Sequence, residues 1–302
     1  MSMESLVLDA PDGHKIAAKF RAAEGKTRGL VQILHGMAEH CARYADVADA
    51  MAAEGWAVVM HDHRGHGPAT PDADLGHFAD EDGWQRVIDD VRQVREMGRE
   101  RAPDGPLVLL GHSMGSFIAL YEQCDRPGTV DKLVLSGSNK GGGALVSAGL
   151  GAAKFERFRQ GPRGKSKTLA FLSFGSFNKG FPGRTDFDWL SRDAEHVDRY
   201  VSDAYCGFDC TNQLWIELLG AIIANGRQDR LRRLPKDLGV YLLNGSRDPV
   251  SGGGVGVKGL EVFLRQAGLN DVTRREYAEG RHEMFNETNR DEVVRELLAW
   301  MS

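Results

Sequence analysis

The sequence predicts a doubly wound α/β fold, in which a mainly parallel sheet carries helices on both of its faces. First, short apolar runs alternate with amphipathic segments along most of the 302 residues, as strands and helices do in this class. Second, most of these runs are continuously apolar, which is typical of parallel strands covered on both faces. Third, 37 of the 302 residues are glycine, a larger share than the roughly 7% of an average protein. These glycines stand mostly at the ends of apolar runs, where strands turn into helices.

The first half of the chain contains six expected strands. The first two are separated by the turn Pro11-Asp12-Gly13. A stripe of Val87, Val91, Val94 and Met97 indicates a helix between two of the later strands. The expected strands are SLVLDA (5–10), HKIAAKF (14–20), VQILH (31–35), AVVMHD (57–62), LVLLG (107–111) and KLVLSG (132–137), and the expected helices are Tyr44–Glu54, Trp84–Arg101 and a segment from Met114.

Residues 138–212 interrupt this pattern, because no clear buried strand occurs there. They contain GGGA, a basic segment RFRQGPRGKSK and an aromatic stretch studded with small polar residues. We interpret them as a cap of short helices inserted into the core. The α/β pattern then returns over 213–302, with strands expected at 239–245 and 272–277 and helices at 213–225, 258–267 and 291–301. The expected organisation is a first core part (1–137), a cap (138–212) and a second core part (213–302).

Composition and charge exclude several classes of function. The chain is 41% hydrophobic and 27% charged, as in soluble globular proteins. A net charge of −5 leaves no global basic field for nucleic acid. No apolar run approaches the roughly 20 residues that span a bilayer, and the beginning MSMESLVLDAPDG is not typical of a signal peptide. We therefore expect a cytoplasmic protein without a transmembrane segment.

The stretch LVLLGHSMGSFIAL places one hydroxyl, Ser113, between two glycines and between two apolar runs. A G-x-S-x-G sequence after a buried strand and before a helix is typical of a strained turn that lifts a nucleophilic serine out of the core. Gly111 and Gly115 permit close backbone approach because they lack a Cβ. The alternative is a tight turn whose serine only caps the helix.

A serine needs a base, and the base needs a carboxylate that orients it. His282 lies in the polar segment EYAEGRHEMFNE, between the last expected strand and the last helix. Asp248 lies in LLNGSRDPV, just beyond the end of a strand, where functional groups of α/β sheets gather. The chain order Ser113, Asp248, His282 is that of one known arrangement of this triad. Alternatively, Asp248 only starts a turn and His282 is an exposed loop residue.

The negative oxygen that develops during acyl transfer needs two backbone donors. The N–H of Met114, directly after the nucleophile, is the first candidate. The second candidate is the N–H of Met37, in the loop LHGMAEH that follows an early strand.

Metal sites are not expected. The four cysteines are too few for a disulfide framework, and Cys206 and Cys210 have no two further ligands grouped near them in the sequence. His61, His63 and His66 in MHDHRGHG look like ligands, but we interpret them as part of a hydrogen-bonded loop at the sheet edge.

The segments HGMAEHCARY, HDHRGHG, GHSMG, NGSRDPVS and GRHEMFNE, in this order, resemble the monoacylglycerol lipase and lysophospholipase-like branch of the α/β-hydrolases, which includes serine aminopeptidase-like sequences. The resemblance covers nearly the whole chain and is weaker in the cap. It implies eight mainly parallel strands with a cap inserted after the sixth. It also implies the same site residues, Ser113, Asp248, His282, Met37 and Met114, and no cofactor.

The expected function is hydrolysis of esters with a single acyl chain, monoacylglycerol-like or lysophospholipid-like, through an acyl-enzyme. Phe171, Phe174 and Phe177 in the cap are candidates for an apolar acyl pocket, although they are equally well interpreted as the cap's own small core. The same triad would serve an aminopeptidase, a thioesterase or an acyltransferase. A ligand-binding homologue without catalysis is a further alternative. The expected partner is a small ester or lipid-like substrate, with transient contact between the cap and a lipid surface.

Overall fold

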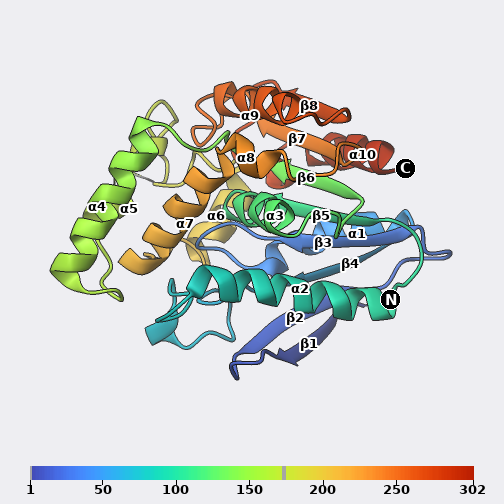
Figure 1. Ribbon diagram of the computed structural model, residues 1–302, viewed down its shortest axis with the longest axis horizontal. Coiled ribbons are helices and arrows are strands. Elements are labelled where there is room, and N and C mark those ends of the chain that lie inside the picture. The colour runs from blue at the N-terminus through green and yellow to red at the C-terminus, as the bar shows by residue number, and fades with distance from the viewer. Residues whose placement is uncertain (1, 172–174) are drawn as a thin grey trace.

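The computed structural model describes residues 2–171 and 175–302, and its sheet contains eight strands (Figure 1). The strand order is β1-β2-β4-β3-β5-β6-β7-β8. The first three strands in this order pair antiparallel, and all later pairs are parallel. The strands are β1 (Glu4–Asp9), β2 (Lys15–Arg21), β3 (Gly29–Leu34), β4 (Trp56–His61), β5 (Leu107–His112), β6 (Lys132–Ser136), β7 (Gly239–Gly245) and β8 (Val272–Tyr277).

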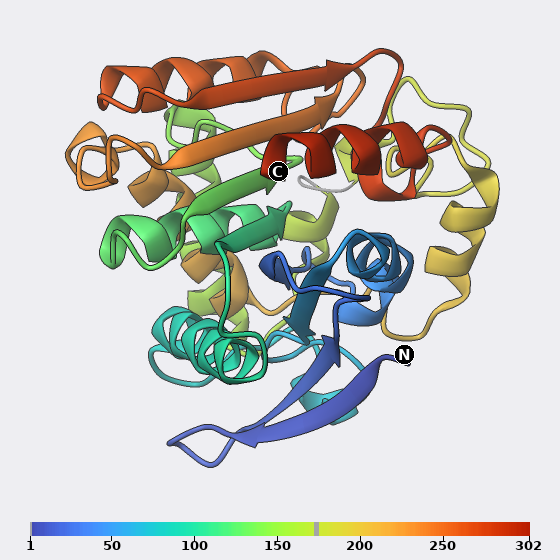
Figure 2. The ribbon, with the colours of Figure 1, turned by 90° about the vertical axis from the view of Figure 1, so that its right-hand side faces the viewer.

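Helices cover both faces of this sheet. α1 and α10 pack on one face, and α2, α3 and α9 pack on the other. Figure 2 shows β1 and β2, in blue, at one edge of the sheet and β7 and β8 at the opposite edge. The helices are α1 (Ala45–Ala53), α2 (Gly83–Arg101), α3 (Met114–Asp125), α4 (Ala144–Gln160), α5 (Lys167–Ala170), α6 (Ala194–Ser202), α7 (Asn212–Asn225), α8 (Gln228–Leu231), α9 (Val255–Gln266) and α10 (Arg290–Met301).

The predicted fold class is confirmed, and burial explains why the sequence revealed it. Every residue of β3, β4, β5 and β7 is buried, so these strands are largely apolar on both faces instead of alternating between apolar and polar residues. In α2 the predicted stripe faces the core, since Val87, Val91 and Val94 are fully buried and Met97 packs beside them. Helix boundaries differ from the expected ones by a few residues, as terminal turns are weakly encoded.

Residues 138–212, called the cap from here on, lie between β6 and the beginning of α7. Their described part contains α4, α5 and α6 and no strand. α4 stands at the left edge of Figure 1, away from the sheet. A small, mainly aromatic cluster lies inside the cap: Trp189, Leu190 and Tyr200 are buried, and Phe177, Phe181 and Phe187 pack against them. None of the described helices is long and apolar enough to cross a membrane.

Candidate active site

Ser113 occupies a sharp turn between β5 and α3. Its φ of 51° lies in the left-handed region, which costs a non-glycine residue about 1–3 kcal/mol. The backbone is held there because Ser113 N–H donates to the carbonyl of Ser136 at 2.9 Å, and Ser113 accepts a hydrogen bond from Ser116 Oγ at 2.6 Å. A Cβ on Gly111 would overlap the carbonyl of Gly115, and a Cβ on Gly115 would overlap that of Leu34. Both glycines are therefore required for this turn to pack against the sheet.

His282 and Asp248 come together from two loops at the carboxyl ends of β7 and β8. His282 Nδ1 lies 2.9 Å from Asp248 Oδ1, and the two side chains are 2% and 0% exposed. The same carboxylate oxygen accepts a hydrogen bond from Val250 N–H at 2.9 Å. Burial opposes a charged imidazole, but the carboxylate of Asp248 outweighs it and raises the pKa of His282 above its usual 6.5. The pair has the geometry of a base whose tautomer and orientation a carboxylate controls.

The imidazole of His282 lies at the carboxyl ends of β5, which precedes Ser113, and of its neighbour β6. A Cβ on Gly137, directly after β6, would stand 2.7 Å from His282 Cε1, so only glycine fits beneath the ring. The ring centroids of His282 and His112 are 4.7 Å apart. The structure thus brings the three predicted triad residues to one end of the sheet, at neighbouring strands β5, β6, β7 and β8.

The predicted oxyanion donors flank the same turn. Met114 begins α3, so its N–H has no carbonyl partner within the helix. Met37 lies in the loop after β3, and a Cβ on the preceding Gly36 would stand 3.3 Å from Ser113 Cβ. The next residue, Ala38, has a φ of 54° and is held by hydrogen bonds to its carbonyl from Tyr200 Oη and Gly207 N–H, both 2.9 Å. The cap therefore supports the loop that carries Met37.

Sequence reasoning missed a buried charge network beneath this loop. Glu39 accepts hydrogen bonds from Gly36 N–H at 2.5 Å and Tyr44 Oη at 2.9 Å, and it pairs with Arg43. Arg43 also makes a bidentate pair with Glu283, next to His282, with both distances 2.6 Å. One guanidinium thus ties the loop of Met37 to the loop of the histidine. In the sequence, the four-residue spacing of Glu39 and Arg43 in HGMAEHCARY was the feature from which their pairing could have been predicted.

The pKa values of the two carboxyl groups in this network are shifted in opposite directions. Burial raises the pKa of Glu39. Burial also opposes ionisation of Glu283, but Arg43 outweighs it and holds the pKa of Glu283 at about 2. Tyr200 of the cap covers the guanidinium carbon of Arg43 at 4.8 Å from the ring centroid. The network is shielded from solvent, so its charges act strongly on their neighbours.

The three predicted substrate-contacting phenylalanines are placed differently. Phe177 packs against Trp189, with centroids 5.1 Å apart, and Trp189 in turn lies 5.1 Å from the ring of His282. Phe171 is 65% exposed at the cap surface. Phe174 lies outside the described residues. The cap's aromatic cluster therefore reaches the predicted base through Trp189.

The predicted histidine loop after β4 is buried. His35 Nε2 accepts a hydrogen bond from His63 N–H at 2.9 Å. Burial lowers the pKa of His61 to about 3 and that of His66 to about 4, so both are neutral. Among the described residues, none of these histidines belongs to a group of three or more metal-ligand side chains.

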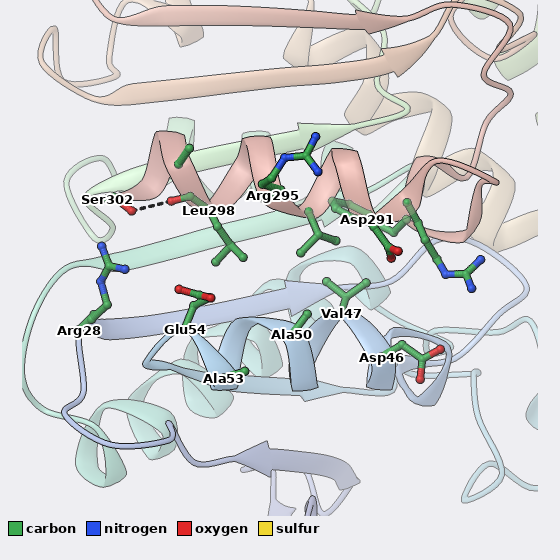
Figure 3. A pocket seen from close by; sticks show the side chains of 14 residues that line it. Arg28, Asp46, Val47, Ala50, Ala53, Glu54, Asp291, Arg295, Leu298 and Ser302 are labelled. Carbon is green, nitrogen blue, oxygen red and sulfur yellow. Dashed lines mark hydrogen bonds between the residues drawn. The ribbon is translucent and has the colours of Figure 1, made fainter.

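A groove of about 580 Å³ lies elsewhere, between α1 and α10 (Figure 3). Val47 and Ala50 of α1 face Leu298 of α10 across its apolar floor. Its rim carries charges of both signs, including Arg295 and Asp291. None of the predicted site residues lines this groove, so it is separate from the candidate active site.

Comparisons with known proteins agree with this geometry. A family model described as "Serine aminopeptidase, S33" matches residues 25–289. The chain is 28% identical to monoglyceride lipase of Mus musculus, covering 96% of this chain and 88% of the relative, and 28% identical to monoacylglycerol lipase of Mycolicibacterium smegmatis, covering 91% and 88%. A thermostable carboxyl esterase from Bacillus coagulans superposes with a TM-score of 0.91 at 25% identity, covering 100% of this chain and 98% of that one.

These comparisons confirm the predicted class of enzyme, a carboxylic ester hydrolase of the lipase and esterase type. They also confirm the resemblance drawn from the sequence motifs. With a family match across residues 25–289 and the sheet described above, the chain belongs to the serine aminopeptidase S33 family of the α/β-hydrolases.

Proposed function

We propose that the protein hydrolyses esters with a single acyl chain, such as monoacylglycerols or lysophospholipids, with Ser113, His282 and Asp248 as its catalytic triad. One observation carries the proposal. The buried pair of His282 and Asp248, 2.9 Å apart, lies against Gly137 at the strand ends beside the strained turn of Ser113. Relatives named monoglyceride and monoacylglycerol lipase support a substrate with one acyl chain.

The reaction would proceed through an acyl-enzyme. Ser113 Oγ attacks the ester carbonyl and passes its proton to Nε2 of His282, while Asp248 stabilises the imidazolium through Nδ1. The N–H groups of Met37 and Met114 bind the oxyanion, each contributing about 3 kcal/mol by comparison with measured donors. His282 then protonates the leaving alcohol as the C–O bond breaks. Water, deprotonated by the same histidine, releases the acid and restores Ser113.

The activity should depend on pH through His282. The neutral imidazole is the base, so activity is lost as pH falls through the pKa of this residue. Because Asp248 raises that pKa above 6.5, the acid limb of kcat/KM should have its midpoint above pH 6.5. A profile of kcat/KM from pH 5 to 9 on a soluble aryl ester measures it. A midpoint below pH 6 would contradict the proposed pairing.

An aminopeptidase, the main alternative, needs a free acidic group to hold the substrate amine. Two acidic residues of the cap, Asp193 and Glu195, are candidates for this group. Asp193 caps α6 through the N–H groups of Glu195 and His196 and pairs with Arg290 at 3.1 Å. Glu195 has a side chain that is 82% exposed to solvent. Neither carboxylate is a free amine anchor in the described structure.

The acyl chain is proposed to lie along the cap's aromatic cluster. Truncating Phe177, which packs on Trp189, should reduce kcat/KM on laurate esters about three- to tenfold relative to acetate esters, because roughly 1 kcal/mol of apolar contact is lost. The measurement is a p-nitrophenyl ester series from acetate to laurate, with Ser113→Ala as the blank.

The matched control is Phe171→Ala, since Phe171 is 65% exposed. We expect this variant to keep the wild-type chain-length profile. Equal effects of Phe177→Ala and Phe171→Ala, or a wild-type preference for acetate alone, would contradict an acyl site at this cluster.

We further propose that α4 contacts lipid surfaces that present the substrate. Its solvent face exposes Phe155 and Phe158, which are 62% and 88% accessible, beside Lys154 and Arg157. Apolar side chains flanked by cations are suited to an anionic interface. Phe155→Ser with Phe158→Ser should reduce co-flotation with phosphatidylglycerol vesicles severalfold and leave hydrolysis of soluble acetate esters unchanged. Unaltered flotation would contradict the proposal.

A further inference from the structure

A cluster of metal-ligand side chains lies where the cap meets the core. His40 belongs to the loop after β3, and Asp203 and Cys206 belong to the turn after α6. One ring nitrogen, one carboxylate oxygen and the thiol sulfur of these residues all lie within 4.8 Å of one another. We propose that His40, Asp203 and Cys206 form a binding site for a divalent transition metal, with Zn²⁺ as the ion that fits the donors best.

The donor set suits zinc in kind and in spacing. Zn²⁺ binds imidazole, carboxylate and thiolate in tetrahedral sites, with bonds of about 2.0–2.3 Å, so its ligand atoms lie roughly 3–4 Å apart. His40 Nε2 and Asp203 Oδ2 are already 2.9 Å apart. Only modest side-chain rotation is required to surround an ion. Three protein ligands would leave the fourth position to water.

The backbone holds two of the three ligands in one short turn. Cys206 N–H donates to the carbonyl of Asp203 at 3.1 Å, and Tyr205 N–H donates to Asp203 Oδ1 at 2.8 Å. The carbonyl of His40 accepts a hydrogen bond from Arg43 N–H at 3.3 Å, and the Nδ1 of His40 is buried with no hydrogen-bond partner among the described residues. The side chains of His40 and Asp203 are 11% and 33% exposed, so an ion can reach them from solvent.

The local charges favour a cation. The carboxyl groups of Glu39, Asp203 and Glu283 lie near Cys206, together with the guanidinium of Arg43. Binding would replace the S–H bond of Cys206 by a metal–thiolate bond and release the proton to solvent. An Asp203 carboxylate and a Cys206 thiolate would then neutralise a dication.

The site is connected to the loop of Met37. Gly207, next to Cys206, donates its N–H to the carbonyl of Ala38 at 2.9 Å, and His40 follows Ala38 by two residues. A metal bound to both segments would fix the loop of Met37 to the cap turn, so the proposed oxyanion donor could not adjust its position during the reaction. Zinc should therefore inhibit the enzyme, a consequence that rests on the proposed function, whereas the binding itself does not.

Binding is tested directly with Co²⁺ as a spectroscopic replacement for Zn²⁺. The wild-type protein should show a near-ultraviolet thiolate-to-cobalt band at one equivalent, which Zn²⁺ abolishes by displacement. Cys206→Ser should lose the band, and His40→Ala and Asp203→Asn should weaken cobalt binding at least tenfold. Cys210→Ala, which removes the other cysteine of this segment, is the matched control and should keep the band. The proposal is wrong if no band forms or if the band survives Cys206→Ser.

Inhibition provides an independent readout. Cys206→Ser should raise the zinc concentration for half-inhibition of ester hydrolysis at least tenfold, while Cys210→Ala should not. Equal inhibition of both variants and the wild type would show that zinc inhibits at another site and would contradict the proposed coupling. If hydrolysis is absent in every variant, the cobalt band still decides the metal site, and only the proposed function fails.

Discussion

Ser113→Ala is expected to lower kcat on p-nitrophenyl esters by about 10⁴- to 10⁶-fold, because no other group in the triad can form the acyl-enzyme. The thermal unfolding midpoint should remain near that of the wild type or rise, since the substitution preserves Cβ and removes only a hydroxyl from a strained position. Steady-state kinetics together with calorimetry measure the two effects. Single-turnover mass spectrometry of the wild type should show an acyl group on the peptide that contains Ser113.

Two results would contradict this assignment. Full activity in the variant would exclude Ser113 as the nucleophile. A wild-type protein that binds esters but never forms the acyl adduct would favour the non-catalytic ligand-binding alternative. His282→Ala provides the matching control, because it should lose comparable activity while leaving the serine in place.

Arg43→Met should lower kcat about 100-fold with a smaller change in KM. Glu39 and Glu283 would face each other as buried carboxylates without their shared cation, and the loops of Met37 and His282 would separate. Displacements near 1 Å in such positioning can cost about 10² in rate. Loss of the guanidinium charge would also favour the imidazolium of His282, whose pKa the neighbouring Glu39 and Glu283 already act to raise, so this pKa should rise further. The acid limb of the pH profile should therefore move to higher pH.

The chain offers a matched control for Arg43. Arg95 of α2 is also buried and pairs with a buried carboxylate, Glu122 of α3, at 3.0 Å, yet it is not among the site residues. Arg95→Met should cost about 3–5 kcal/mol of stability, as loss of a buried pair does, but leave kcat per folded molecule and the pH profile unchanged. Arg43→Lys should recover part of kcat. Identical kinetic effects of the two methionine variants would show that Arg43 acts only through stability.

The sequence by itself was sufficient for the fold class, and it was also the source of the residues proposed for the triad. Parallel strands covered on both faces are mostly apolar along their length, so β3, β4, β5 and β7 can be recognised as largely apolar runs in the sequence. Ser113 was identifiable because its turn needs Gly111 and Gly115, and that requirement is local in the chain. Asp248 and His282 were found because each follows the carboxyl end of a strand, a place that connectivity alone predicts.

Only the tertiary structure decided which distant residues meet. Arg43 pairs with Glu283, 240 positions later, and no local pattern encodes such a contact. His40 contacts Asp203 only because the cap folds back onto the loop after β3. The residues near His40 in the sequence therefore gave no indication of the proposed metal site. The sequence does not distinguish Phe171 from Phe177, yet Phe171 is exposed and Phe177 packs on Trp189. Local propensity specifies strands, turns and helices, whereas the tertiary packing, within the core and between cap and core, selects the partners of the buried charges and rings described here.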